Sequence, residues 1–432
     1  MNPFKTKKYI AIAKEPVYVG TGGYRIGRVD NTIIRDPATN LPKIPGSTIS
    51  GNARYYSWLA YRSKGMDLNL GCSKGKKTNG ENACGKCPIC LTYGFINDEG
   101  AQSGLAYFSD ARILFFPVAT MVGTVWVTSD EIVKEFIDTN ASGSGGVEVD
   151  ENEFICSDKM AELPKGSDDK EILNFGWIML KKKENKKING WKLKSNSSNE
   201  EVLELKDVFD EIKYKLCVVS AKVFHHIVNS NLETRTSVSI NPVTGAAESG
   251  ALFTYEALPR GTVFIMDVTY ENPMNYSKPE PMEIVIGTVE KGFELFSSLG
   301  IGGMGTRGFG KIEIKKDKFL SEKEYWESIK NYLENLSNKA RQLKNEIEQK
   351  KSEIKSISDD KKKKDKEKEI KELCKNLDSL NSTLDLWKSH LESQKEILKE
   401  KINEFQKILS VISGINIEIP EGCRKEENNG TK

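Results

Sequence analysis

The chain has 432 residues, 38% of them apolar and 29% charged, a composition typical of a soluble globular protein with two or three domains. Its 64 basic and 62 acidic side chains leave a formal net charge of +2, which excludes a uniformly basic coat for nucleic acid but permits a local basic groove. The longest apolar stretch, residues 113–127, is interrupted by Pro, Gly and Thr, and the start has no apolar signal-peptide core, so we expect a cytoplasmic protein without membrane contact.

The first segment with candidate chemistry lies near the N-terminus. Asp30 follows a glycine-rich turn and precedes a possible short strand. The sequence PGST then predicts the start of a helix, with Ser47 or Thr48 as its cap. A helix N-terminus with two hydroxyls and with Lys43 nearby is a natural phosphate site, although capping alone would explain the two hydroxyls equally well.

Four cysteines follow in the pattern C-x11-C-x2-C-x2-C, at Cys72, Cys84, Cys87 and Cys90. Cysteines at this spacing, separated by Gly, Lys, Asn and Pro, favour a tetrahedral Zn²⁺ site within a knuckle at 72–90. An iron–sulfur cluster is the alternative. Because four protein ligands leave no open position on zinc, we expect a structural site and not a catalytic one.

The middle of the chain alternates short apolar runs with turn residues. Strands are expected at 105–116, 123–129, 215–224, 261–270 and 282–289, and helices at 131–137 and 197–215. This pattern predicts an α+β fold with an antiparallel sheet. The stretches 141–153 and 181–200 have the composition of loops, and the second, which is rich in lysine, could be solvated or could contact a phosphate backbone.

A glycine-rich segment, GIGGMGTRGFGKIEI, occupies residues 300–314. It is neither a Walker A loop nor a dinucleotide-binding fingerprint, because it lacks the G-K-[S/T] ending and the strand-to-helix context. Glycines permit close backbone approach and positive φ, so a tight structural loop and a phosphate-binding loop remain open.

Charged residues become much more frequent after about residue 320. Apolar residues there recur at alternating three- and four-residue steps over 326–354 and again over 370–409, separated by the polar stretch SDDKKKKDKEK. These are the seams of two long helices, and they predict an antiparallel helical hairpin, with a continuous dimeric coiled coil as the alternative. We therefore expect one domain over 1–320 and a helical hairpin with a polar tail over 321–432.

Three segments together resemble the RAMP superfamily of CRISPR effector proteins. They are LPKIPGSTISGNAR (41–54), GLAYFSDARILFFPVATMVGTVWVTS (104–129) and GGMGTRGFG (302–310), and the second resembles the repeated backbone subunit of the type III-B (Cmr) complex. The resemblance implies a modified RRM-like (ferredoxin-like) palm with inserted fingers and a thumb, here at 225–250. It also implies copies that polymerise on a guide CRISPR RNA (crRNA) beside other type III effector subunits, and Mg²⁺- or Mn²⁺-dependent cleavage of the complementary target RNA.

The resemblance also assigns site residues. It implies that Asp30, in VDNTIIRD, orients the attacking 2′-hydroxyl or holds a divalent ion, assisted by Tyr255 and Glu256. The implied RNA contacts are Lys43, Ser47, Thr48, Arg54, Arg235, Gly302, Gly303, Thr306, Arg307 and Gly308. Tyr18 stands where the family often has a histidine.

Three other interpretations are compatible with the sequence. The chain could be the type III-A (Csm) counterpart of this backbone subunit, or a non-catalytic guide-binding scaffold. It could also be an adaptor whose main function resides in the predicted helical hairpin.

Overall fold

A computed structural model describes residues 3–22, 29–138, 147–157, 160, 163–183, 192–194, 212–276, 281–315, 322–354 and 360–394. The helix predicted at 197–215, the lysine-rich stretch around Trp191 and the seam beyond Gln394 lie largely outside these residues. Among the helices described, none is both long enough and apolar enough to span a bilayer.

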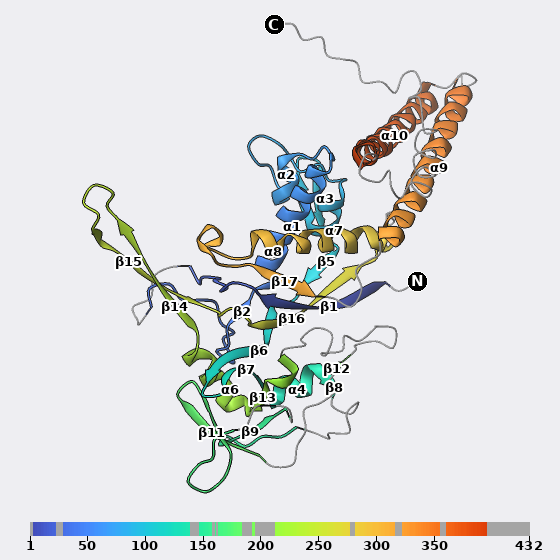
Figure 1. The fold of residues 1–432 in the computed structure, drawn as a ribbon. Helices are drawn as coiled ribbons and strands as arrows, with labels where there is room; N and C mark the ends of the chain where they lie inside the picture. The colour runs from blue at the N-terminus through green and yellow to red at the C-terminus, as the bar shows by residue number, and fades with distance from the viewer. Residues whose placement is uncertain are drawn as a thin grey trace.

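A mixed sheet of 11 strands, in the part of the chain described, forms the centre of the molecule (Figure 1). Its main order is β10-β11-β9-β13-β7-β6-β16-β1-β17, with β2 paired to β6 and β5 paired to β16. The strands are β1 (Phe4–Ala13), β2 (Lys43–Ile44), β5 (Ala106–Phe108), β6 (Ala111–Thr120), β7 (Gly123–Ser129), β9 (Glu153–Cys156), β10 (Ile172–Phe175), β11 (Ile178–Lys182), β13 (Leu216–Val219), β16 (Val263–Glu271) and β17 (Ile312–Lys315). The predicted antiparallel pairing holds for most strands, but the sheet is mixed, because β13 pairs with β7 and β11 with β9 in parallel.

The two faces of the central strands enter different cores. Along β1, Tyr9 and Ala11 belong to the largest apolar cluster, whereas Ile10 belongs to a second cluster. The alternation follows from the two-residue period of a strand. The main cluster includes residues of the helices above the sheet, and the second cluster lies against the lower lobe that contains β7, β9 and β13 (Figure 1).

Helices cover the upper face of the sheet. They are α1 (Gly46–Ser63), α2 (Leu70–Lys74), α3 (Pro88–Tyr93), α7 (Met282–Glu294) and α8 (Phe296–Leu299), and the β3–β4 hairpin (Gly94–Asn97 and Gly100–Ser103) follows α3. In the lower lobe lie α4 (Asp130–Phe136), α6 (Ala221–Ser230) and the short strands β8 (Ile137–Asp138) and β12 (Lys192–Leu193).

The strand expected at 282–289 is wrong, because this segment forms the first half of α7. Residues from Ile284 to Glu290 are all buried, so the helix has no exposed face along this stretch. A helix buried all round lacks the amphipathic pattern that distinguishes it from a buried strand. The strand expected at 215–224 is likewise shorter than predicted, because it ends at Val219 and α6 begins at Ala221.

A two-stranded hairpin, β14 (Glu233–Ile240) and β15 (Ala247–Ala257), projects from the body of the molecule (Figure 1). It occupies most of the predicted thumb at 225–250. His225 to Ser230 belong instead to α6, and the hairpin extends to Ala257. Several apolar side chains on it are exposed, including Val243 at 91% and Leu252 at 61%.

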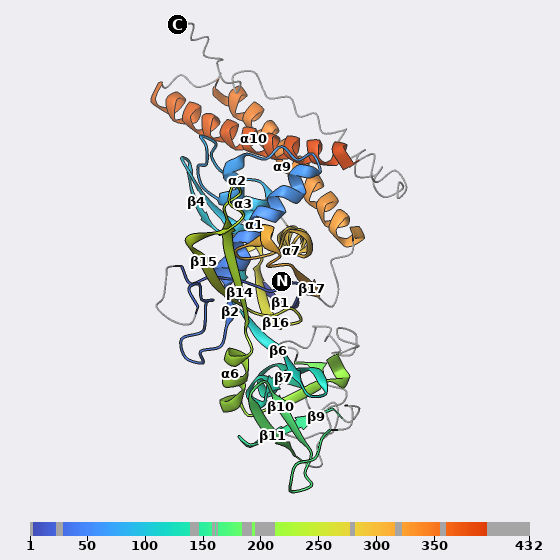
Figure 2. The ribbon, with the colours of Figure 1, turned by 60° about the vertical axis from the view of Figure 1, so that its left-hand side comes forward.

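The C-terminal part of the described chain is a pair of long helices, α9 (Glu322–Ile354) and α10 (Asp360–Gln394), which pack against each other (Figures 1 and 2). Lys350 and Lys366 form ion pairs with Glu369 and Glu353 across the pair. The expected helical hairpin is therefore present over these residues.

Candidate functional site

Asp30 lies at the base of the projecting hairpin, and β15 fixes its carboxylate. Asp30 Oδ2 accepts hydrogen bonds from the amide (2.9 Å) and the hydroxyl (2.8 Å) of Thr254. The Asp30 amide donates in turn to Thr254 Oγ1 at 3.1 Å. The bond from the Thr254 amide, followed by that from its hydroxyl, lowers the pKa of Asp30, so the carboxylate is ionised at neutral pH.

The segment after Asp30 runs beside β15 and ties Asp30 to the hairpin. The Asn31 amide donates to the Thr254 carbonyl at 3.0 Å, and the Glu256 amide donates to the Asn31 carbonyl at 3.0 Å. These bonds form a short parallel bridge between Asn31 and Tyr255. The position of Asp30 therefore depends on the position of the hairpin strand.

Glu256 holds the same segment through an ion pair. Its Oε1 lies 2.6 Å from Arg35 Nη2, and its Oε2 accepts the Ile33 amide at 3.3 Å. Arg35 Nε also donates to Asn229 Oδ1 of α6 at 3.0 Å. The Glu256 carboxylate thus joins the segment around Ile33 to the base of the hairpin, and these contacts occupy the oxygen atoms expected to assist catalysis.

Tyr255 lies on the opposite face of β15 from Thr254 and Glu256, as the alternation of a strand requires. It is only 6% exposed, and its ring meets the ring of Tyr18 edge-on, with centroids 5.8 Å apart. Its cross-strand partner is Arg235, whose guanidinium lies over the Phe309 ring at 4.7 Å and pairs with Glu233. The hairpin therefore separates Tyr255 and Arg235 from Asp30.

The glycine-rich loop packs against the same Tyr18. Gly303 donates to the Tyr18 carbonyl at 2.9 Å. Gly302 has φ +81°, and a Cβ there would lie 2.3 Å from the Tyr18 carbonyl oxygen. The base of the loop therefore needs glycine for structural reasons. Its tip, with Thr306, Arg307 and Gly308, is exposed.

The helix start predicted at PGST is present, but its capping differs from the prediction. Pro45, and neither Ser47 nor Thr48, is the N-cap residue, and the Gly46 amide donates to Asp110 Oδ1 at 2.8 Å. Asp110 Oδ2 also pairs with Lys43 at 2.7 Å, and their hydrogen bond raises the pKa of Lys43. The capping prediction is wrong because a carboxylate distant in sequence supplies the negative charge that a helix N-terminus favours. Ser47 remains exposed and Thr48 half-buried.

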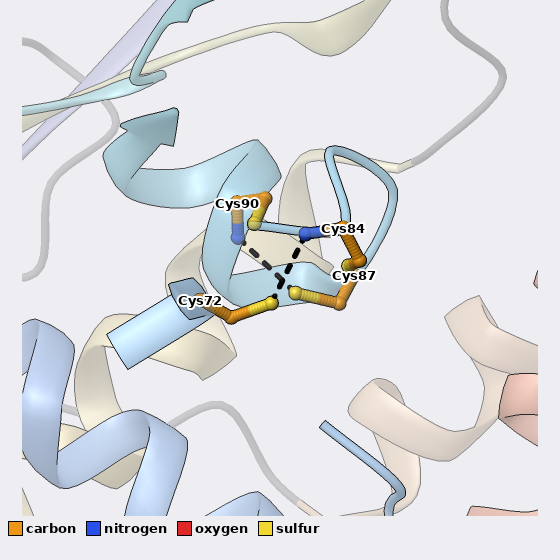
Figure 3. Close-up of side chains that lie close together, drawn as sticks. All are labelled: Cys72, Cys84, Cys87 and Cys90. Carbon is orange, nitrogen blue, oxygen red and sulfur yellow. Dashed lines mark hydrogen bonds between the residues drawn. The ribbon is translucent and has the colours of Figure 1, made fainter. Parts of the chain in front are cut away.

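The four cysteines of the predicted knuckle converge (Figure 3). All four Sγ atoms lie within 4.8 Å of one another, with Cys72 on α2, Cys87 as the N-cap of α3 and Cys90 within α3. The Cys84 amide donates to Cys72 Sγ at 3.3 Å, and the Cys90 amide donates to Cys87 Sγ at 3.4 Å.

The donor set and its surroundings fit a single metal ion. Burial raises the pKa of the Cys87 thiol, so four thiolates this close together would be stable only around a bound cation. Zn–S bonds of about 2.3 Å in a tetrahedron place the sulfurs about 3.8 Å apart, so this arrangement is consistent with structural zinc. An iron–sulfur cluster would hold the sulfurs further apart.

Arg54, expected to contact RNA, lies beside the cysteines. Its Nε donates to the Cys72 carbonyl at 2.9 Å and its Nη1 to the Tyr93 carbonyl at 3.2 Å. Burial lowers the pKa of Arg54, and the nearby thiols counteract this effect. The guanidinium thus supports the knuckle from the side of α1.

Sequence reasoning missed Thr254 and Arg35, the partners of Asp30 and Glu256. The only local signal was the alternation of polar residues in FTYE, which places Thr254 and Glu256 on one face of a strand. Their pairing with residues more than 200 positions earlier depends on the tertiary fold.

Residues 12–313 match the family model for the RAMP superfamily. The chain is 25% identical over 306 residues to the CRISPR system Cmr endoribonuclease Cmr4 of Pyrococcus furiosus, covering 70% of this chain and 92% of that protein. It is 35% identical over 100 residues to the CRISPR system Cms endoribonuclease Csm3 of Methanothermobacter thermautotrophicus, covering 23% of this chain and 33% of that protein.

Two solved structures are also similar. A cryo-EM structure of a type III-B Cmr-beta complex in the apo state contains a chain with a TM-score of 0.45 and 16% identity, covering 72% of this chain and 97% of that chain. A crystal structure of Cmr4 gives a TM-score of 0.42 and 20% identity, covering 73% of this chain and all of that chain.

Proposed function

The chain belongs to the RAMP superfamily, and from this premise we propose that it is the repeated backbone subunit of a type III-B CRISPR effector complex. In this proposal several copies polymerise on a guide crRNA beside other type III subunits, and each copy cuts the complementary target RNA. The observation that carries the catalytic part is the Asp30 carboxylate, held ionised by Thr254 at the base of the projecting hairpin.

The proposed reaction is attack of a target 2′-hydroxyl on the adjacent phosphate. The O2′–P bond forms as the P–O5′ bond breaks, leaving a 2′,3′-cyclic phosphate and a 5′-hydroxyl. With its lowered pKa, the Asp30 carboxylate is a weak base at neutral pH, and it is better suited to accepting a hydrogen bond from the 2′-hydroxyl and orienting it. A Mg²⁺ or Mn²⁺ ion bound by Asp30 would stabilise charge on the phosphate.

Glu256 and Tyr255 act indirectly in this proposal. Glu256 positions the Asp30 segment through Arg35, and Tyr255 packs the hairpin base against Tyr18. We therefore propose both as positioning residues.

The RNA-binding surface is proposed to include the hairpin and the glycine-rich loop. The exposed apolar residues of β14 and β15 suit a wedge that enters a duplex by shape. Arg307 and Thr306, on the exposed loop tip, suit phosphate contact, with Gly302, Gly303 and Gly308 shaping the loop. Ser47 and Thr48 remain candidates, whereas Lys43 is partly neutralised by Asp110 and Arg54 is engaged at the cysteines.

We also propose that Cys72, Cys84, Cys87 and Cys90 hold a structural Zn²⁺. The domain division is proposed as an RRM-like RNA-binding and nuclease domain over 1–320, followed by a helical domain over 321–432. The four Sγ atoms, which lie within 4.8 Å of one another, support the zinc assignment. The start of α9 at Glu322 supports the domain boundary.

A single 2′-deoxy substitution in the target tests the reaction. Cleavage by the assembled complex should stop at the substituted position and continue at the other sites, and the normal products should end in a cyclic phosphate. Cleavage that continues at the deoxy position would contradict the proposed nucleophile.

A second candidate function is a non-catalytic guide-binding scaffold. Two observations favour it. The Glu256 carboxylate is engaged in an ion pair with Arg35, and Tyr18 stands where the family often has a histidine. In that case the complex would bind guide and target but would cut neither the normal nor the substituted RNA.

A further inference from the structure

The cysteine knuckle and the C-terminal helix pair share one buried apolar cluster. Its members include Cys72, Cys87, Cys90 and Met66 around the knuckle, Tyr325, Ile329, Leu333 and Leu336 of α9, and Leu384 and Trp387 of α10. Figure 2 shows α10 lying across the region of α1 and α2. The knuckle is therefore part of the surface on which the helix pair rests.

The first turns of α9 reach this surface through Tyr61 of α1. The Tyr61 and Tyr325 hydroxyls are hydrogen-bonded at 2.7 Å, and both side chains are buried. Lys291 Nζ lies over both rings, 4.4 Å from the Tyr61 centroid and 4.1 Å from that of Tyr325. Tyr61 shares the apolar cluster with Cys87, so it connects α9 to the knuckle.

The second half of α10 contacts both the knuckle and the segment after α1. Lys86, which lies between Cys84 and Cys87 in the sequence, donates to Ser382 Oγ. Ser389 Oγ donates to the carbonyl of Gly65, which follows α1, at 3.3 Å. Trp387 is 2% exposed, belongs to the shared cluster and also meets the ring of Tyr332 on α9 edge-on.

At the end of the helix pair away from the knuckle, α9 and α10 contact each other directly. A separate apolar cluster there contains Ala340, Ile347, Ile370, Cys374 and Leu377. The ion pairs Lys350–Glu369 (2.6 Å) and Lys366–Glu353 also join the two helices. The pair therefore has contacts that do not depend on the knuckle.

The knuckle has little regular structure of its own. Its helices, α2 and α3, have five and six residues, and helices this short are not stable without tertiary support. Small cysteine-ligated segments generally take their shape from the bound metal. We propose that the metal ion held by the four cysteines docks the C-terminal helix pair onto α1 and the knuckle, so that loss of the ion releases α9 and α10 as a still-paired hairpin.

This inference rests on the proposed zinc site and extends it to a part of the chain beyond the 12–313 family match. It has a reciprocal consequence, because two coupled binding events must affect each other equally. Removing a docking contact of α10 should therefore weaken retention of the metal.

Hydrogen exchange of the full-length protein, with its metal and after chelation, tests the first direction. Elemental analysis before and after treatment establishes that zinc was bound and then removed. We expect faster exchange over 325–336 and 380–387 after removal, with little change over 340–350 and 370–377 or in β1 and β16. Unchanged exchange at 325–336 and 380–387 would overturn the inference while leaving the zinc assignment intact. Global loss of protection would also overturn it, and absence of metal from the untreated protein would overturn both proposals.

The equilibrium affinity for zinc, measured by competition with a chromogenic chelator, tests the reciprocal direction. Trp387→Ala removes a side chain of the shared cluster, and Ile347→Ala is the matched control because Ile347 is fully buried in the distal cluster of the same helix pair. We expect the dissociation constant for zinc to be at least about 5-fold higher for Trp387→Ala than for wild type, within the usual range of coupling between sites, and unchanged for Ile347→Ala. Equal dissociation constants for the two variants would contradict the coupling.

Discussion

The ion pair between Arg35 and Glu256 gives the most informative single perturbation. The two side chains are 20% and 13% exposed, and the Nη2–Oε1 distance is 2.6 Å. A hydrogen bond to a charged group contributes about 1.5–3 kcal/mol to stability when it is shielded from water. We expect Glu256→Ala and Arg35→Ala each to lower the free energy of unfolding by about this amount, and the double variant to lose little more than either single variant.

Denaturant unfolding of wild type, the two single variants and the double variant completes a double-mutant cycle. The exposed ion pair between Lys165 and Asp169 serves as the control pair. Their side chains are 60% and 82% exposed, and such surface pairs contribute about 0–1 kcal/mol. If the losses of unfolding free energy of the two single variants simply added in the double variant, the proposed Arg35–Glu256 interaction would be refuted.

The same variants distinguish positioning from direct catalysis. If the Arg35–Glu256 ion pair positions Asp30, both alanine variants should slow target cleavage to a similar extent. The expected loss is on the order of tens-fold, as for a misplaced reacting group. Glu256→Gln, which keeps one acceptor oxygen for Arg35, should lose less activity. If Glu256 were instead a catalytic base, Glu256→Gln would be as inactive as Glu256→Ala, and Arg35→Ala would remain nearly active.

Three further predictions follow from the site. Replacing Cys87 and Cys90 with serine should release one equivalent of zinc, measured by elemental analysis, and should destabilise the fold; unchanged metal content would contradict the four-cysteine site. Gly302→Ala places a Cβ against the Tyr18 carbonyl at positive φ and should lower the free energy of unfolding by about 1–3 kcal/mol. Gly305→Ala is the control, because its Cβ would lie at ordinary van der Waals distance from its neighbours, and it should be tolerated. Equal losses of stability in the two variants would contradict the loop geometry. Because the pKa of Asp30 is lowered, its contribution to the docking of the hairpin base is present above the ordinary aspartate pKa and is lost only as pH falls through the lowered value. Cleavage by the assembled complex should therefore lose no activity through Asp30 between about pH 8 and pH 5. An acid limb in that window that moves to higher pH in Thr254→Val, which lacks the hydroxyl donor to Asp30, would contradict this assignment.

Local sequence patterns predicted the elements whose causes are local. The PGST sequence predicts the start of α1, the cysteine spacing predicts the cluster, and the seam of apolar residues predicts the α9–α10 pair. In each case the signal is a periodicity or a spacing within a few dozen residues.

Local patterns could not predict the contacts that distant residues decide. Helix α7 is buried on all sides from Ile284 to Glu290, so its sequence there resembles a strand. Asp110 takes over the capping role that the sequence assigns to Ser47 or Thr48, and Arg54 turns toward the knuckle. Glu256 follows the same rule, because its partner Arg35 is 221 residues away.

The most direct test of the proposed function is target-RNA cleavage by the reconstituted complex with added Mg²⁺ or Mn²⁺. Wild type is compared with Asp30→Asn, and Asp169→Ala serves as a control carboxylate that is 82% exposed in the lower lobe. The proposal predicts regularly spaced cuts by wild type and by the control, no cuts by Asp30→Asn, and unchanged binding of guide and target in all three. Cleavage that persists in Asp30→Asn, or that is absent from wild type with both RNAs bound, would contradict it.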